Sequence, residues 1–338
     1  MQYLKHTYLL FIIFIVSNVT LSQQRLTPAQ AIHLVEYKLA DLRAGKFEAA
    51  SVTFEEGRCI VTGKNKVHDL RVVIDPGAAR VLEISRDGFD FYTWEGIKVV
   101  GHRGNIKFTP ENTIPAIEKA IELGCHLIEI DIRETRDGEL ILMHDETVDR
   151  TTDGSGKVCD LRLAEIEKLD AGSWFDDKFT GTKVPTLRQA LAAMRDKALP
   201  DLDFKAGTPQ KLVDILREED LLGKVTLYCG DWDLMRQTLD IAPDGFLLRP
   251  TVPGGHTGLP VVLSSFDPQI VNINWDEFSE ELVRDVHIAG KKSFLNAMQQ
   301  DTEFIRWLMM NMLPDYLQSD HVDLLVLALQ EWDGIDKK

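Results

Sequence analysis

The 338-residue chain has only four cysteines, and no two of them have the C-x-x-C spacing of a zinc or redox site. We therefore expect no metal site built from thiolates. Four cysteines allow three fully paired disulfide arrangements in an exported chain, so the pairing of Cys59, Cys125, Cys159 and Cys229 stays open. Cys125 and Cys229 border apolar, strand-like runs, where a buried free thiol is the commoner state.

Basic residues are also scarce: 38 Lys and Arg stand against 54 Asp and Glu, for a formal net charge of −16. A nucleic-acid partner would need a basic face, so the charge balance argues against one. An anionic small-molecule substrate is still compatible with this charge, because a bound divalent cation with Arg103 and Lys205 can make one site locally positive.

The apolar run near the amino terminus, residues 8–16, is shorter than the ~20 residues that span a bilayer. It follows Lys5 and precedes a polar stretch ending at Ser22, which is the order of a secretory signal peptide. No cysteine directly follows the run, so there is no cysteine in position to carry a lipid. We expect residues 1–22 to be cleaved, leaving an exported protein, periplasmic or secreted, without a membrane anchor.

Residues 26–92 have the pattern of a small, separate α+β domain. Thr27-Pro28 is typical of a helix start, and apolar residues then recur at helical spacing until Gly45. Four strand-like runs follow, with a turn at Asp75-Pro76-Gly77 between the last two. The segment bears a short, generic resemblance to PepSY-like domains of exported bacterial proteins, and we expect an accessory role for it.

From residue 97 onward, short apolar runs alternate with helical stretches, as in parallel βαβ units. Only residues 133–138 separate the second and third runs, and they contain the hairpin signal Asp137-Gly138, so one of these strands should double back. The pattern predicts a modified (β/α)8 TIM-type barrel, an α/β fold with chemistry at the carboxyl ends of its strands. The nine expected strands are residues 98–101, 127–132, 139–143, 201–205, 224–229, 245–248, 270–275, 292–295 and 316–318.

Carboxylates recur at two-residue spacing in these strands. Glu129 and Asp131 should leave one face of a strand together, because side chains alternate between faces. Paired acids repel one another unless a positive charge lies between them, and a hard cation such as Ca²⁺ or Mg²⁺ is the simplest solution. Asp203 and Lys205 also share a face and add a third acid and a cation.

Two histidines stand where apolar runs end. His102 follows residues 98–101 and His144 follows residues 140–143, so we expect both, with Lys205 and Asp320, at the carboxyl ends of barrel strands. Asn112 is expected to cap a helix that runs from Thr113 to about Leu123.

These residues lie in motifs that resemble the glycerophosphodiester phosphodiesterase family between about residues 97 and 325. The matching motifs, in the family's order, are H-R-G at 102–104, P-E-N-T at 110–113, E-x-D at 129–131, T-x-D-G at 135–138, H-D at 144–145 and D-R-T-T at 149–152. Two departures stand out: Asp203 replaces a glutamate common in the family, and residues 293–296 differ from its late aromatic strand motif.

The resemblance implies a metal-dependent enzyme that hydrolyses glycerophosphodiesters to glycerol 3-phosphate and an alcohol. Our hypothesis is that one divalent cation, Ca²⁺ or Mg²⁺, is held by Glu129, Asp131 and Asp203. His102 and His144 would be the general acid and base.

Three further residues have expected roles in this site. Arg103 and Lys205 would offset charge on the phosphate oxygens, and the resemblance gives Glu111 a place in the supporting hydrogen-bond and metal network.

Several alternatives remain open from the sequence. A phospholipase D-like or phosphoinositide-lyase-like enzyme would share these residues, and a non-catalytic binding relative is the alternative outside enzymes. Formation of a cyclic phosphate and direct attack by water are not distinguished, nor are the alcohol head group, the choice of cation or the oligomeric state. His126 is expected to be structural, His256 to be a solvated loop residue, and Trp174 and Phe175 either to pack in the core or to line a substrate wall.

Overall fold

A computed structural model describes residues 26–41, 46–65, 69–86, 89–93, 96–298, 303–305 and 314–335. The chain separates into two compact units, one formed chiefly by residues 1–95 and the other by residues 96–286 and 291–338. The expected signal peptide, residues 1–22, lies outside the described residues. None of the helices in the described ranges has the length and apolar character needed to cross a membrane.

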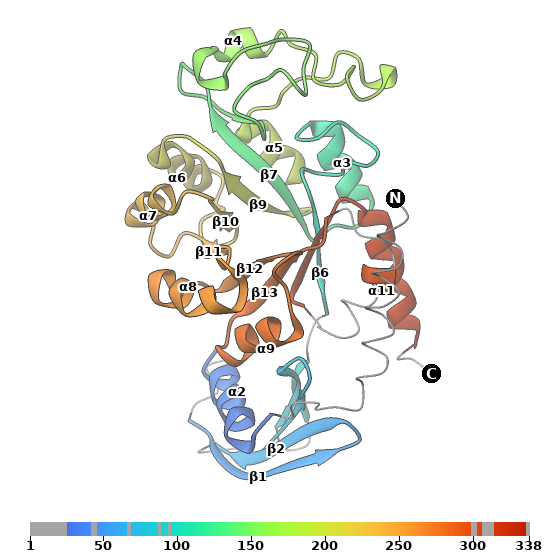
Figure 1. Ribbon diagram of the computed structural model, residues 1–338, viewed down its shortest axis with the longest axis vertical. Helices are drawn as coiled ribbons and strands as arrows, with labels where there is room; N and C mark the ends of the chain where they lie inside the picture. Colours follow the sequence, from blue (N-terminus) through green and yellow to red (C-terminus); the bar gives the residue numbers. More distant parts are fainter. Residues whose placement is uncertain are drawn as a thin grey trace. The chain divides into compact units, whose positions relative to one another are not determined.

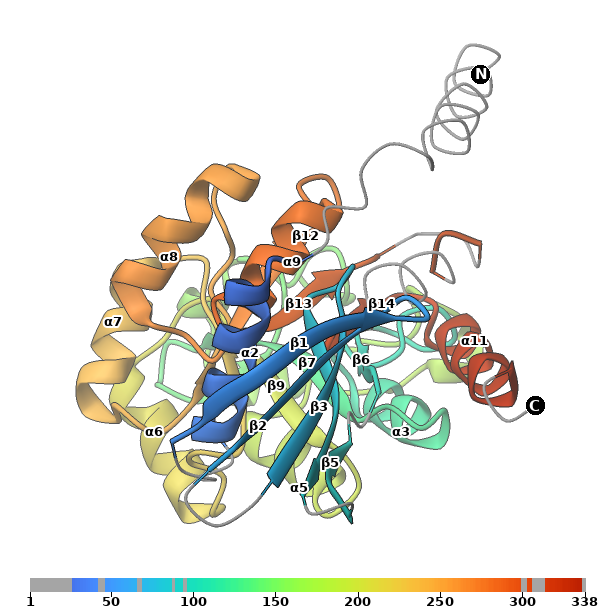
Figure 2. The same ribbon diagram turned by 90° about the horizontal axis from the view of Figure 1, so that it is seen from below.

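The amino-terminal unit is one helix on an antiparallel sheet. The capping box of Thr27 and Gln30 starts helix α2 (Pro28–Asp41), and α2 contacts β1, β2 and β4 (Figure 2). The strands pair in chain order as β1 (Glu48–Glu55), β2 (Arg58–Lys64), β3 (Asp69–Asp75), β4 (Arg80–Arg86) and β5 (Phe89–Thr93). The four predicted strands are present, and β5 is a fifth strand that was not predicted.

Packing explains why this unit is compact. Val35 and Leu39 of α2 and Val61 and Val72 of the sheet are fully buried in one hydrophobic cluster. The Asp75 side chain accepts hydrogen bonds from the backbone N–H groups of Gly77 and Ala78, and this closes the predicted turn between β3 and β4.

The larger unit is a nearly closed barrel of eight parallel strands surrounded by helices (Figure 1). The spatial order is β11, β10, β9, β7, β6, β14, β13, β12, and a single parallel bridge between Thr251 and Asn272 joins the two ends. This confirms the predicted fold. The barrel strands are β6 (Lys98–Gly101), β7 (Leu127–Glu134), β9 (Leu199–Phe204), β10 (Thr226–Tyr228), β11 (Leu247–Leu248), β12 (Ile270–Asn274), β13 (Lys292–Asn296) and β14 (Tyr316–Ser319).

Helices that follow the barrel strands bury apolar residues on one side, such as Ala116, Ile117 and Ala120 in the helix after β6 and Leu212, Val213 and Leu216 in the helix after β9. Several have clear start signals, such as the capping box of Thr186 and Gln189 on α5 and the Asp231 cap on α7. The described helices of this unit are α3 (Ile114–Glu122), α4 (Leu163–Ile166), α5 (Leu187–Met194), α6 (Pro209–Glu218), α7 (Trp232–Ile241), α8 (Leu259–Phe266), α9 (Glu280–Ile288) and α11 (Val322–Ile335).

The third predicted strand, residues 139–143, doubles back as expected. Strand β8 (Leu140–Leu142) pairs antiparallel with the far end of β7, through the turn at Asp137-Gly138. Residues 143–186 continue from β8 and carry α4. Together with β8 they form a small apolar cluster of Ile141, Met143, Val148, Val158, Ile166, Ala171 and Val184. We call residues 135–186 the β8 arm (Figure 1).

The four cysteines are free thiols: Cys59, Cys125 and Cys229 are buried and Cys159 is exposed. Burial raises the pKa of Cys125 and of Cys229 to about 12, so both stay protonated at neutral pH. The expectation of buried thiols at Cys125 and Cys229 is therefore confirmed.

A chain that begins at Trp94 is expected to fold, because the barrel and its arm have apolar cores of their own. Circular dichroism should show helix and strand content in proportion to the barrel's residues, with a cooperative thermal transition. A matched chain that begins at Gln23 is the control. If the shorter chain unfolded without a cooperative transition and the control unfolded cooperatively, the barrel would depend on the amino-terminal unit for its stability.

Candidate active site

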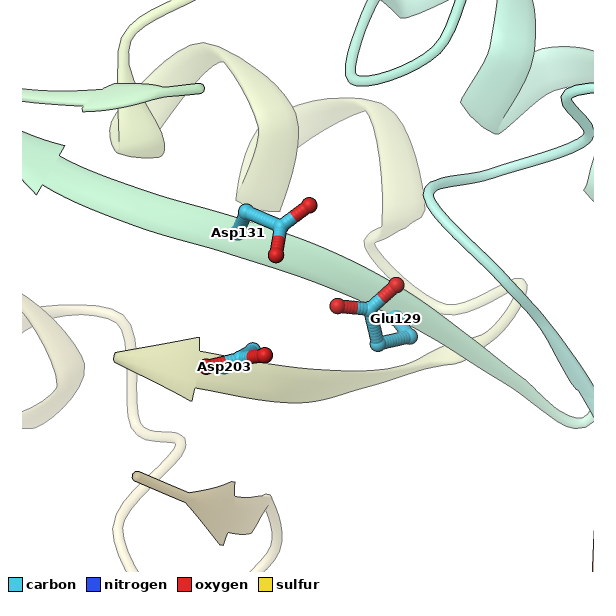
Figure 3. Close-up of side chains that lie close together, drawn as sticks. All are labelled: Glu129, Asp131 and Asp203. Atoms are coloured by element: carbon cyan, nitrogen blue, oxygen red, sulfur yellow. The ribbon is translucent and has the colours of Figure 1, made fainter. Parts of the chain in front are cut away.

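Three carboxylates converge inside the barrel. Strands β7 and β9 are parallel neighbours in a register that pairs Asp131 with Asp203, and Glu129 lies two residues before Asp131 on the same face. Ligand oxygens of the three residues lie within 4.8 Å of one another, and all three residues are buried (Figure 3). We call Glu129, Asp131 and Asp203 the acidic cluster.

Crowding of negative charge shifts the pKa values of this cluster. Burial, reinforced by Asp131 and Asp203, raises the pKa of Glu129 well above its ordinary value. Burial and the Asp131 charge raise the pKa of Asp203 to about 6. Burial also opposes ionisation of Asp131, but Lys205 and Arg103 outweigh it and lower that pKa. The cluster thus holds more negative charge than its protein partners neutralise.

The cluster fits a hard divalent cation. Asp203 Oδ1 is buried and has no hydrogen-bond partner among the described residues, while Asp203 Oδ2 accepts from Lys205 Nζ at 2.5 Å. Lys205 Nζ also lies 3.2 Å from Asp131 Oδ1. Three carboxylates with an unused acceptor are a suitable donor set for Ca²⁺ or Mg²⁺. The side chain of Asp203 reaches the cluster although it is one methylene shorter than the family's glutamate.

His102 follows β6 at the barrel mouth and is backed by an acid. Its Nδ1 lies 2.6 Å from Asp320 Oδ1, just past the end of β14, and its Nε2 accepts from Arg103 Nε at 3.2 Å. These two bonds assign the neutral tautomer with the proton on Nδ1. His102 therefore carries a lone pair on Nε2, on the side of Arg103 and Asp131.

His144 also has a carboxylate at its Nδ1, but it comes from a different part of the fold. Its Nδ1 lies 2.7 Å from Asp145 Oδ1, and its carbonyl oxygen accepts two hydrogen bonds from the guanidinium of Arg133. Burial lowers the pKa of His144, against the opposing charge of Asp131 and the bond to Asp145. The expectation that His144 ends a barrel strand was wrong: it follows β8, so the antiparallel arm brings it to the site.

The H-R-G turn connects the histidine to the cluster. The backbone N–H of Arg103 donates to Glu129 Oε2 at 2.7 Å, and its guanidinium Nε lies 3.5 Å from Asp131 Oδ2. Gly104 has φ +85°, and a Cβ there would lie 2.7 Å from the carbonyl carbon of Ala116. Only glycine lets the turn pack this closely against α3.

Glu111 links the two halves of the site. It accepts from Arg103 Nη1 at 2.8 Å and forms a bidentate pair with Arg150, whose Nε also donates to Asp145 at 2.6 Å. Although burial opposes it, these two arginines lower the pKa of Glu111. A continuous chain of charged hydrogen bonds therefore runs from His102 to His144 through Arg103, Glu111, Arg150 and Asp145.

The predicted role of Asn112 was wrong. The cap of α3 is Thr113, whose hydroxyl accepts from the Ala116 N–H. Asn112 has φ +54°, and its amide donates to Asp131 Oδ2 at 2.7 Å while its Oδ1 accepts from the Asp131 N–H at 3.1 Å. The amide thereby fixes the orientation of Asp131, a role that the side-chain type alone did not reveal.

The sequence reading also gave no role to Asp145, Arg150 or Asp320. Asp145 and Arg150 lie in the H-D and D-R-T-T motifs, so the motifs pointed to them but no pairing could be inferred. Asp320 was expected at a strand end, and its bond to His102 became visible only when β6 and β14 were found to be neighbours.

The other residues considered from the sequence lie outside the acidic cluster. His126 accepts from the Val99 N–H at 3.1 Å and is structural, as predicted. His256 is half exposed in its loop and bonds Asp285. Trp174 is partly exposed; its indole N–H donates to the Ala171 carbonyl and its ring lies edge-on to that of Phe175.

Comparison with known proteins supports one family. The glycerophosphoryl diester phosphodiesterase family model matches residues 102–234, from the H-R-G motif to α7. A glycerophosphodiester phosphodiesterase of Caldanaerobacter subterraneus subsp. tengcongensis is 41% identical over 186 residues, which cover 52% of this chain and 76% of that protein. A glycerophosphodiester phosphodiesterase of Bacillus subtilis is 42% identical over 141 residues, 38% of this chain and 48% of that protein.

Solved structures agree with the sequence comparisons. A glycerophosphodiester phosphodiesterase from Agrobacterium tumefaciens superposes with a TM-score of 0.61 at 30% identity, over 68% of this chain and 99% of that one. An Oleispira antarctica phosphodiesterase, solved with the product sn-glycerol-3-phosphate, has a TM-score of 0.64 at 24% identity, over 70% and 97% of the two chains. The barrel, the motifs and these matches together show that the chain is an enzyme of the glycerophosphodiester phosphodiesterase family.

Proposed function

We propose that this enzyme hydrolyses glycerophosphodiesters to glycerol 3-phosphate and an alcohol, with one bound Ca²⁺ or Mg²⁺ ion and with His102 and His144 as proton carriers. The observation that carries the proposal is the buried acidic cluster, flanked by two histidines that each have a carboxylate on Nδ1. The solved Oleispira relative holds sn-glycerol-3-phosphate as its product, which supports the same product here.

Glu129, Asp131 and Asp203 would hold the cation, which when bound would supply Lewis acidity to the phosphate ester and to a neighbouring hydroxyl. Asn112 keeps Asp131 oriented for this purpose. Arg103 and Lys205 offset the charge that builds on the nonbridging oxygens.

His102 is our candidate for the general base. Its neutral tautomer leaves Nε2 free to take a proton once Arg103 turns toward the phosphate. His144 is our candidate for the general acid, protonating the departing alkoxide while Asp145 stabilises the charged ring. The nucleophile is either the substrate's adjacent hydroxyl, which gives a cyclic phosphate, or water.

Export is part of the proposal and rests on the amino-terminal sequence alone. The amino-terminal unit is proposed to be accessory, because its described residues contain no histidine-carboxylate site like that of the barrel.

An assay on glycerophosphocholine, glycerophosphoethanolamine and glycerophosphoinositol, with Mg²⁺, Ca²⁺ or chelator, tests the function. Release of glycerol 3-phosphate that depends on the cation is expected, and phosphorus NMR would detect a cyclic intermediate. Products that retain the phosphate on the head-group alcohol would instead indicate a different phosphodiesterase.

Replacing either histidine should lower kcat by about 10²-fold or more, since a general acid or base contributes 10²–10⁴-fold. His144→Ala should recover on an ester with a p-nitrophenol leaving group, which needs no proton, whereas His102→Ala should not. His256→Ala, in a half-exposed loop, is the matched control. Recovery of His102→Ala instead would reverse the two roles.

Asp203→Asn should raise the divalent-ion concentration needed for half-maximal activity by about tenfold or more, because one charged ligand is lost. Asp233→Asn on the exposed surface of α7 is the control. Unchanged ion dependence in a folded Asp203→Asn protein would show that the cation is held without this residue.

Asp145→Asn should reduce kcat by about 10- to 100-fold without changing cation affinity, because Asp145 orients His144 and contacts no residue of the acidic cluster. The pH profile of kcat should shift as well. Asp160→Asn, a substitution elsewhere on the arm, should leave both kcat and its pH profile unchanged. Loss of cation binding in Asp145→Asn would mean that the acid acts on the cluster and not on the histidine.

A further inference from the structure

A fourth carboxylate lies beneath the acidic cluster. The register of β7 and β9 pairs Glu129 with Asp201 just as it pairs Asp131 with Asp203, so all four acids face the barrel interior. Asp201 is fully buried but is not among the three residues whose oxygens converge. Its charge adds to the field at Glu129.

Arg249 occupies the space next to this acid. It directly follows β11, is 2% exposed, and its Nε donates to Asp201 Oδ1 at 2.6 Å. Thr226 donates to the same oxygen, whereas Asp201 Oδ2 has no hydrogen-bond partner within the described ranges. Arg249 Nη1 donates to Asn272 Oδ1 at 3.1 Å.

Aromatic rings hold the guanidinium in place. The Cζ atom of Arg249 lies 4.4 Å from the ring centroid of Phe294 and 5.0 Å from that of Tyr228. The position of this positive charge is therefore fixed by β10, β11, β12 and β13 together. The fields of Asp203 and Glu129 also reach it.

Fold stability alone is a poor explanation for such a pair. A buried ion pair gains little over well-packed apolar residues of the same volume, because both charges lose their hydration. The barrel interior supplies such residues nearby, including Val100, Ile270 and Phe294. The charges of Asp201 and Arg249 are better explained by what they do to the cluster above them.

We propose that Arg249 is a positioning residue that tunes divalent-cation affinity: by neutralising Asp201, it confines the uncompensated negative charge on this face of β7 and β9 to the acidic cluster. The inference rests on the proposed cation site. It predicts that the two partners act in opposite directions. Without Asp201, Arg249 becomes a free positive charge that competes with the cation; without Arg249, a fourth negative charge attracts it.

Calorimetric titration of the full-length protein with MgCl₂ and with CaCl₂ tests this directly, without reference to turnover. Asp201→Asn should weaken cation binding by about tenfold or more, from the Coulomb energy of one unit charge a few ångströms beyond the cluster. Arg249→Met, which keeps the packing between the rings, should strengthen cation binding by about threefold or more, because the charge of Asp201 is then uncompensated. Asp201→Asn/Arg249→Met should return to within about threefold of wild type.

Thr226→Val is the matched control, because it removes a hydrogen bond from Asp201 without changing any charge. Its cation affinity should equal that of wild type. Weakened or unchanged binding in Arg249→Met, or unchanged binding in a folded Asp201→Asn protein, would overturn the proposal. If Asp201→Asn does not fold, Arg249→Met and the double variant still decide it.

The same titration separates this inference from the proposed function. Wild-type protein that bound neither cation would contradict the proposed cation site itself. Wild-type binding that was lost in Asp203→Asn, together with equal affinities in all the Asp201 and Arg249 variants, would contradict only the role of Arg249.

Discussion

Repulsion among buried carboxylates is the constraint on which the rest of the site depends. Two adjacent parallel strands in register place four acids on one interior face, where water cannot screen them. The elements around this face each contribute a positively charged side chain that offsets the negative charge. The H-R-G turn supplies Arg103, the end of β9 supplies Lys205, and β11 is followed by Arg249. Burial and the negative charge that stays uncompensated raise the pKa of Asp203, whose buried Oδ1 has no hydrogen-bond partner among the described residues.

The same repulsion explains why charged side chains from many strand ends meet at the barrel mouth. A carboxylate pair needs its partners within a few ångströms, and in a parallel barrel the carboxyl ends of all strands converge there. Arg103 donates hydrogen bonds to both His102 and Glu111, so the charge network is linked directly to one of the two histidines proposed to transfer protons. Removing one of these charges should therefore change the electrostatic environment of both histidines.

The sequence was sufficient where the information is local or periodic. Two-residue spacing placed Glu129 and Asp131 on one face, and the Asp137-Gly138 turn correctly predicted the strand that doubles back. It failed where pairing depends on which strands become neighbours. The Asp320 carboxylate lies 218 positions from His102, and no spacing rule relates them. Asn112 was misassigned because helix caps and side chains that orient a carboxylate are drawn from the same residue types, and the cap of α3 is Thr113.

The β8 arm has a consequence for how this enzyme loses activity. His144 and Asp145 are carried by a segment whose apolar cluster is separate from the barrel interior, so the arm is a candidate for opening while the barrel stays intact. If His144 acts as proposed, the temperature at which catalysis stops would report the free energy of local opening of the arm and not that of global unfolding. Amide exchange in residues 143–186 would measure that free energy, and mutations that stabilise the arm would extend the working range without touching the active site.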